Sequence, residues 1–179
     1  MKRNIMHLTH KIFSLVFTII LASNSLIAEE ESMVGKEAPP VMLFKYQDDR
    51  YFKSKDFLGK EYVIYNFWAT WCSPCLKEMP DLYKIMEKLD PDMFELVLIN
   101  WLESKQLIRE KFLSKFEDKH TILLDMYGII YERLSGIELK EGAMPSLPLT
   151  VIVDKKGTII YHEHGADVKK LKEFLVKLK

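Results

Sequence analysis

An almost unbroken apolar stretch at positions 62–68, Tyr-Val-Ile-Tyr-Asn-Phe-Trp, constrains the fold of this chain more than any other feature. Its β-branched and aromatic residues favour a strand, and it lacks the polar alternation of a strand that is exposed on one face. A strand of this kind is buried on both sides by covering helices. Residues 74–89 follow with apolar positions at helical spacing, so the sequence predicts a buried strand leading into a helix, with a kink at Pro80.

Further strands and helices alternate along the chain. We expect strands at 41–44, 51–52, 94–100, 121–124, 150–153 and 158–161, and helices at 104–116, 126–134 and 168–178. Ser104 is the expected N-cap of the second helix, and Gly136 the C-cap of the third. The alternation of strands and helices predicts a mainly parallel sheet. The first two and the last two strands should form hairpins, which add antiparallel edges. The fold class is therefore α/β, with a mixed central sheet and helices on both faces.

The first 28 residues have the parts of a secretory signal peptide. They begin with Met-Lys-Arg, continue with a mostly apolar run at 12–27, and end among small residues. The alternative is an uncleaved N-terminal membrane anchor, because the apolar stretch is about 17 residues long, which is the lower limit for spanning a bilayer. With either, residues 29–179 should form one domain beyond the cytoplasmic membrane, in the periplasm or anchored to the outer face of that membrane, where disulfides persist.

Charge and cysteine content exclude several classes of function. The chain has 26 Lys and Arg against 26 Asp and Glu, so it lacks the basic excess that binds nucleic acid. Its two cysteines cannot make a framework of structural disulfides or a four-cysteine zinc site. His162 and His164 alternate close to the end of the last predicted hairpin, but no acid-rich cluster converges there, so metal binding is the weaker interpretation. We expect neither a metal nor a cofactor.

Cys72 and Cys75 lie where the buried strand gives way to the helix. At a helix N-terminus, unpaired amides and the helix dipole favour the thiolate, so Cys72 is the expected nucleophile. Cys75 is close enough along the first turn to attack a mixed disulfide on Cys72, which makes it the expected resolving thiol. This position between strand and helix favours a redox pair over half of a metal site or a passive disulfide.

The chain resembles the thioredoxin superfamily and, within it, the exported TlpA/ResA-like branch. The resemblance is carried by Gly-Lys-Glu-Ala-Pro at 35–39, Asn-Phe-Trp-Ala-Thr-Trp-Cys-Ser-Pro-Cys at 66–75 and Leu-Pro-Leu-Thr-Val-Ile-Val-Asp at 147–154. It implies a thioredoxin-like three-layer sandwich and thiol-disulfide oxidoreductase activity. It also implies that Pro148 is the cis-proline beside the redox pair, whereas the residues alone leave Pro145 as a competitor.

Glu78 is the remaining catalytic candidate. Asn66 stands where thioredoxins commonly carry a buried acid, and an amide cannot accept the proton released from Cys75. Glu78 lies one helical turn after Cys75, and members of the TlpA/ResA-like branch carry an acid there. From the residues alone, a solvated helix glutamate is the alternative.

The resemblance further implies the direction of exchange. Members of the TlpA/ResA-like branch commonly reduce disulfides of exported proteins, often for haem attachment during cytochrome c maturation, with electrons from a membrane-linked donor. One alternative is a protein-thiol oxidant, because an exported dithiol can act either way according to its potential. Another is a copper-handling module that uses Cys72 and Cys75 as soft ligands.

The segment at 136–147 is longer than the short link that the family usually places before its cis-proline. Its apolar residues Ile137, Leu139, Met144 and Leu147 offer contacts to a protein partner, and Gly142 leaves room for movement. We therefore expect this loop to help select the partner. A tolerated surface insertion is the alternative.

Overall fold

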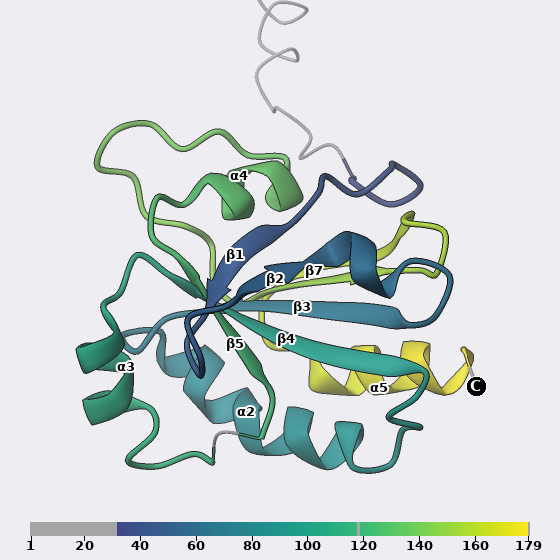
Figure 1. The fold of residues 1–179 in the computed structure, drawn as a ribbon, viewed down its shortest axis with the longest axis horizontal. Helices are drawn as coiled ribbons and strands as arrows, with labels where there is room; N and C mark the ends of the chain where they lie inside the picture. The colour runs from purple at the N-terminus through teal and green to yellow at the C-terminus, as the bar shows by residue number, and fades with distance from the viewer. Residues whose placement is uncertain (1–31, 118, 179) are drawn as a thin grey trace, which may run out of the picture. The chain divides into compact units, whose positions relative to one another are not determined.

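A seven-stranded mixed sheet organises the part of the chain that the computed structural model describes, residues 32–117 and 119–178 (Figure 1). Its spatial order is β2-β1-β5-β4-β3-β6-β7. The strands are β1 (Met42–Lys45), β2 (Tyr51–Lys53), β3 (Tyr62–Trp68), β4 (Phe94–Trp101), β5 (Thr121–Asp125), β6 (Leu149–Val153) and β7 (Ile159–His164). The apolar stretch is the inner strand β3, as predicted. The expected signal peptide or anchor at 1–28 lies outside the described residues.

The direction of the strands differs from the expectation. Only β3–β4 and β4–β5 are parallel, while the other four pairings are antiparallel. The prediction of a mainly parallel sheet is therefore wrong. Both predicted hairpins, β1–β2 and β6–β7, are present, but their inner strands also run antiparallel to β5 and β3. The sequence predicted the hairpins from local turns and carried no signal for the neighbour that each would join.

Helices cover both faces of the sheet, as predicted. One face is covered by α2 (Ser73–Met86), α3 (Lys105–Lys111) and α5 (Val168–Val176), and the other by α4 (Ile129–Ser135) (Figure 1). The short helix η1 (Ser54–Phe57) borders the same face as α4. The apolar side chains of these helices join the core on their own face of the sheet. The alternation of β3 supplies both cores: Ile64 and Trp68 pack toward α2, and Tyr65 and Phe67 toward α4. The redox motif thus follows a strand that is fixed from two sides.

The helix ends differ from prediction by a few residues. Ser104 caps α3 as expected, its Oγ accepting from the Leu107 N–H at 3.3 Å, and Gly136 closes α4 with φ 73°. However, α3 ends at Lys111 rather than 116, and α4 begins at Ile129 rather than 126. Gly128 has a φ of 72°, which is not a helical value, so α4 begins after it. The position requires glycine, because a Cβ there would lie 2.9 Å from the indole nitrogen of Trp101.

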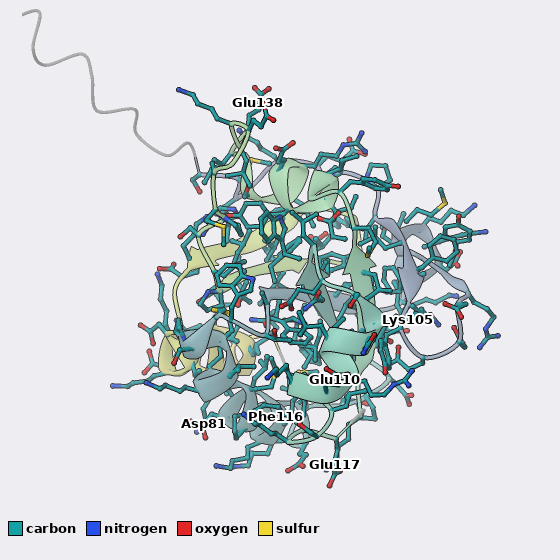
Figure 2. The ribbon with its side chains drawn as sticks, turned by 90° about the vertical axis from the view of Figure 1, so that its left-hand side faces the viewer. Asp81, Lys105, Glu110, Phe116, Glu117 and Glu138 are labelled. Atoms are coloured by element: carbon teal, nitrogen blue, oxygen red, sulfur yellow. A yellow bond between two sulfur atoms is a disulfide. The ribbon has the colours of Figure 1, made fainter. Side chains whose placement is uncertain are left out.

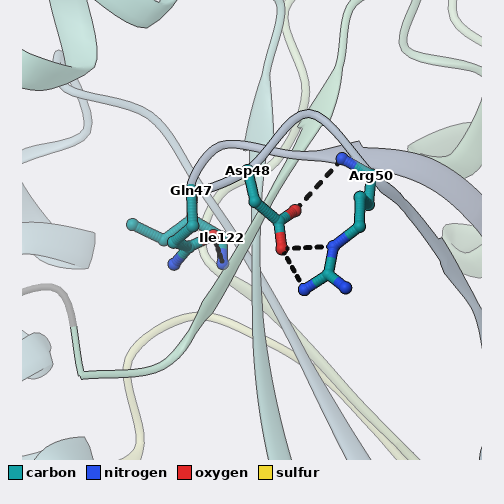
Figure 3. A network of polar contacts seen from close by, with 4 residues as sticks. All are labelled: Gln47, Asp48, Arg50 and Ile122. Atoms are coloured by element: carbon teal, nitrogen blue, oxygen red, sulfur yellow. Dashed lines mark hydrogen bonds and ion pairs between the residues drawn. The ribbon is translucent and has the colours of Figure 1, made fainter.

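The first hairpin is closed by a polar turn that also reaches β5 (Figure 3). Asp48 accepts hydrogen bonds from the Arg50 backbone N–H at 3.1 Å and from its guanidinium Nε at 2.8 Å. Gln47 Oε1 accepts from the Ile122 N–H at 3.3 Å. This turn holds β1 and β2 against the sheet at its outer edge.

Candidate active site

Cys72 and Cys75 form a disulfide at the N-terminus of α2. Strand β3 ends at Trp68, and the chain then turns into the helix with Cys72 as its N-cap, whose Sγ accepts from the Cys75 N–H at 3.3 Å. Pro74 lies in the first turn, where its missing N–H leaves no hydrogen bond unmade. Cys75 is fully buried, while Cys72 retains 3% exposure. Cys72 is therefore the more exposed of the two cysteines.

Pro148 lies at the same end of the sheet as the redox pair. The Leu147–Pro148 peptide bond is cis, and Pro148 rather than Pro145 has this geometry. Strand β6 begins directly after it, and Leu149 lies opposite Phe67 of β3. Pro148 thus precedes β6 where β3 leads into the cysteine motif. The cis-proline is therefore the one that the resemblance implied.

Glu78 is buried on α2, one turn after Cys75, with 7% exposure. The interpretation as a solvated helix residue is therefore wrong. The Asn66 Nδ2 donates to Glu78 Oε1 at 3.0 Å and to Thr150 Oγ1 at 3.1 Å. Burial raises the pKa of Glu78 to about 7, against the lowering effect of the hydrogen bond from Asn66. A carboxyl that titrates near neutral pH can both take and return a proton.

A row of polar side chains links Glu78 with the edge of the sheet. Asn66 of β3 lies opposite Thr150 of β6, which lies opposite Glu163 of β7. These residues and Glu78 line one narrow cleft, together with Asp167 at the start of α5. Glu163 is half-buried and forms an ion pair with Lys170 of α5. The buried Glu78 thus shares the lining of a small cleft with Asp167, which is exposed to solvent.

Sequence analysis missed Glu103, which holds the loop before Cys72. Glu103 is 6% exposed between β4 and α3. Its Oε2 accepts from the Thr70 N–H and from Asn100 Nδ2, both at 2.7 Å, and its Oε1 accepts from Thr70 Oγ1 at 2.5 Å. Thr70 lies two residues before Cys72, so this carboxylate fixes the backbone of the redox motif. The available signal was an acid just after a buried strand, at the sheet end that carries the cysteines.

The loop at 137–147 is attached to α4 near both of its ends. The Leu139 N–H donates to Glu132 Oε1 at 3.0 Å, and the Ser146 N–H donates to Tyr131 Oη at 2.9 Å. Leu139 packs against the core, as does Leu147, so neither is free to serve a partner as expected. Met144 is 61% exposed. Figure 2 shows Glu138, near the start of the loop, projecting outward beside α4.

Across residues 32–117 and 119–178, no group of three or more His, Cys, Asp and Glu side chains is placed to hold a metal ion. None of the helices described there is both long and apolar enough to cross a bilayer.

Comparisons with known proteins match this geometry. The redoxin family model covers residues 33–175. The thiol-disulfide oxidoreductase ResA of Bacillus thuringiensis subsp. konkukian is 31% identical over 151 residues, which is 84% of this chain and 81% of the relative. The thioredoxin-like protein YneN of Bacillus subtilis is 32% identical over 125 residues, 70% of this chain and 68% of the relative.

Solved structures of related proteins are also similar to this chain in fold. A protein assigned as the thiol:disulfide interchange protein DsbE of Chlorobium tepidum superposes with a TM-score of 0.66 at 26% identity, over 80% of this chain and 96% of that one. StoA of Bacillus subtilis gives a TM-score of 0.57 at 25% identity, over 77% of this chain and 98% of that one. The chain therefore belongs to the redoxin family, as a TlpA/ResA-like member of the thioredoxin superfamily and a thiol-disulfide oxidoreductase.

Proposed function

We propose that this protein reduces disulfides of exported proteins outside the cytoplasmic membrane. The observation that carries the proposal is the cysteine pair at the start of α2, where Cys72 retains slight exposure and Cys75 has none. The Cys72 thiolate attacks one sulfur of the partner's disulfide, and the other partner sulfur leaves as a thiolate. Cys75 then loses its proton and attacks Cys72. The second partner thiolate is released, and two electrons have passed to the partner as the Cys72–Cys75 disulfide forms.

Glu78 is the proton acceptor for Cys75 in this proposal. The two residues share the buried side of α2, one turn apart, and the pKa of Glu78 near 7 suits a base that works at neutral pH. Asn66 holds the carboxyl through its Nδ2 and cannot take the proton itself. The cleft beside Thr150 and Glu163 returns the proton to solvent. Pro148 lies beside the pair and positions the partner backbone.

Two arguments support reduction over oxidation. A strong oxidant has a stabilised reduced form. Here the Cys75 N–H donates to the Cys72 sulfur, which favours a thiolate on Cys72. An ionised Glu78 on the same helix disfavours a second negative charge, and so it destabilises that thiolate and the reduced form. The resemblance to the TlpA/ResA-like branch supports the same direction, with haem attachment to cytochrome c as the use of the reduced thiols. A membrane-linked donor would then restore the dithiol.

Export rests on residues 1–28, which we propose act as a signal peptide or an N-terminal anchor. One labelling experiment tests location and direction together. Intact cells that make the full chain are treated with a maleimide that cannot cross the cytoplasmic membrane. An exported reductant should be labelled on Cys72, the more exposed of the two thiols, before lysis. Labelling only after lysis would contradict export, and labelling only after added dithiothreitol would contradict a reducing role.

The purified protein supplies the second arm of this test. Its Cys72–Cys75 disulfide is equilibrated with a dithiothreitol series, and the fraction reduced is read by alkylation. We expect a potential of about −250 mV or lower, as a reductant requires. A value near about −120 mV would instead assign the protein as an oxidant.

A further inference from the structure

Exposed apolar side chains gather where β3, β4 and β5 end. These strands are parallel neighbours, so the loops that follow them lie at one end of the sheet. These loops and the first residue of α4 carry five apolar side chains that are between 43% and 85% exposed: Trp71, Leu102, Met126, Tyr127 and Ile129. Trp71 directly precedes Cys72. Apolar exposure of this kind at the end of the sheet that performs exchange marks a contact surface.

A groove lies beside these loops on the β5 side, and we name it the β5–α4 groove. Its volume is about 710 Å³, and its lining includes Met42, Phe44, Tyr51, Met126, Ile129 and Arg133. Phe44 lies opposite Leu124, so the antiparallel register carries Met42 toward Met126. The groove therefore joins β1, β2, the end of β5 and the start of α4 into one apolar surface.

The charge that lines the β5–α4 groove at the surface is positive. Arg133 is exposed at its side. Asp125 also lines the groove, but it is 2% exposed and its carboxylate accepts from the Tyr131 N–H at 2.9 Å. A bound segment would thus meet apolar side chains along the groove and a guanidinium at one side.

Aromatic contacts join this groove to the redox motif. The rings of Trp71 and Trp101 meet edge to face, with centroids 6.2 Å apart. Trp101 in turn packs against Gly128, where no side chain would fit. Tyr127 and Ile129 flank Gly128, and Ile129 lies in the groove lining. Trp71 and the lining of the β5–α4 groove are therefore linked by contacts through the buried ring of Trp101.

We propose that the β5–α4 groove binds an extended apolar segment of the substrate protein, next to the disulfide under attack, with an acidic side chain facing Arg133. This inference rests on the proposed exchange at Cys72. In this inference the chain beside the attacked partner sulfur crosses Trp71, the exposed ring that directly precedes Cys72. Methionine and aromatic side chains suit segments of varied sequence, because they repack at low cost. Pro148 would contact the partner from the opposite, β6 side of Cys72.

The test uses two synthetic peptides with the same intramolecular disulfide. One carries Leu, Phe, Leu and Glu on each side of the disulfide, and the other carries Ser, Gly, Ser and Glu. The reduced protein is mixed with each peptide and with oxidised glutathione, and single-turnover rates are measured. In the double variant Tyr127→Ser with Ile129→Ser, we expect about a tenfold fall for the apolar peptide, equivalent to about 1.4 kcal/mol. Rates for the polar peptide and glutathione should not change.

Leu58→Ser and Val176→Ser are the matched controls, since both side chains are about half exposed and neither lines the groove. Arg133→Glu is a second variant that keeps the apolar lining. It should slow reduction of the apolar peptide and speed reduction of a peptide in which Lys replaces Glu.

Three results would overturn the proposal: unchanged rates for the apolar peptide, an equal fall for glutathione, or a dimer that the double variant converts to a monomer with peptide rates unchanged. The last result, read by sedimentation velocity, would assign the groove to a second copy of the chain. Failure of the unaltered protein to reduce glutathione and both peptides would instead refute the reducing function itself.

Discussion

Burial gives Glu78 a charge that changes near neutral pH, and this has a consequence for stability. The unfolded carboxyl titrates near 4.5 and the folded one near 7. Between these values the folded protein holds more protons than the unfolded chain, so stability falls as pH rises and then levels off above about 7. The difference corresponds to a loss on the order of 3 kcal/mol across this range.

Glu78→Gln should remove this loss, because glutamine has similar size and can still accept from Asn66 Nδ2. The oxidised variant should exceed the parent in free energy of unfolding at about pH 8.5 and differ little at about pH 5. Urea unfolding at the two pH values measures this. Glu173→Gln, at an exposed position on α5, is the control and should track the parent at both. Parallel pH profiles for the parent and Glu78→Gln would refute the raised pKa.

Glu103 supports the redox motif through three accepted hydrogen bonds from Thr70 and Asn100. Glutamine at this position has one acceptor oxygen and turns an N–H group toward a donor. We expect Glu103→Gln to lower the free energy of unfolding by about 1–3 kcal/mol and to slow exchange at Cys72. Glu110→Gln, an exposed change on α3, should stay within about 0.5 kcal/mol of the parent. Equal urea midpoints for both variants would show that the loop does not depend on Glu103.

At the scale of elements, a role of the loop between α4 and β6 in partner contact stays a prediction, and the exposed residues of the loop are the ones that can test it. Residues 140–144 are exposed, and the Ala143 N–H closes a turn onto the Lys140 carbonyl at 2.9 Å. Leu139 and Ser146 anchor the loop and should be left intact. The informative change is therefore to replace 140–144 with Gly and Ser residues of equal number.

This replacement should leave reduction of a small disulfide unchanged and slow the reaction with a disulfide-containing exported protein. Cys75→Ser provides the readout, since it should leave the partner attached to Cys72 as a stable mixed disulfide. The amount trapped per unit time is compared with and without the loop replacement. Cys72→Ser should trap nothing, and equal trapping by it would reverse the assigned roles of the cysteines. An unaltered trapping rate after loop replacement would leave the loop a surface insertion.

The ends of the elements show where local patterns stop being informative. Apolar residues at helical spacing continue beyond α3, but Phe112 is the C-cap, and its ring packs against Trp68 and Phe116 with ring centroids 4.1 and 4.8 Å apart. A ring that packs in the core from a turn has the same spacing as one on a helix. The shape of the core decides between them, and that shape depends on strands distant in the chain.

Across the whole molecule, the sequence predicted what depends on neighbouring residues. The buried strand, the helix after it and the cysteines at their junction are local, and all were found where expected. The order of the strands depends on contacts between distant segments, so the mixed directions around β1 and β6 were not foreseen. Glu103 was missed for the same reason, because its partner Thr70 belongs to another loop. The burial of Glu78 could be inferred only from the resemblance.

The register between β3 and β6 also limits how this protein can change over generations. Strand β3 is apolar on both sides of Asn66, so a one-residue slip would still bury its side chains well. That slip would turn Asn66 toward α4 and set an aromatic ring, Tyr65 or Phe67, against Glu78. A descendant with such a change would fold and yet lack the donor that holds its acid. Insertions can therefore accumulate in the loops, while the spacing from Asn66 to Cys72 and from Pro148 to Thr150 has to be inherited unchanged.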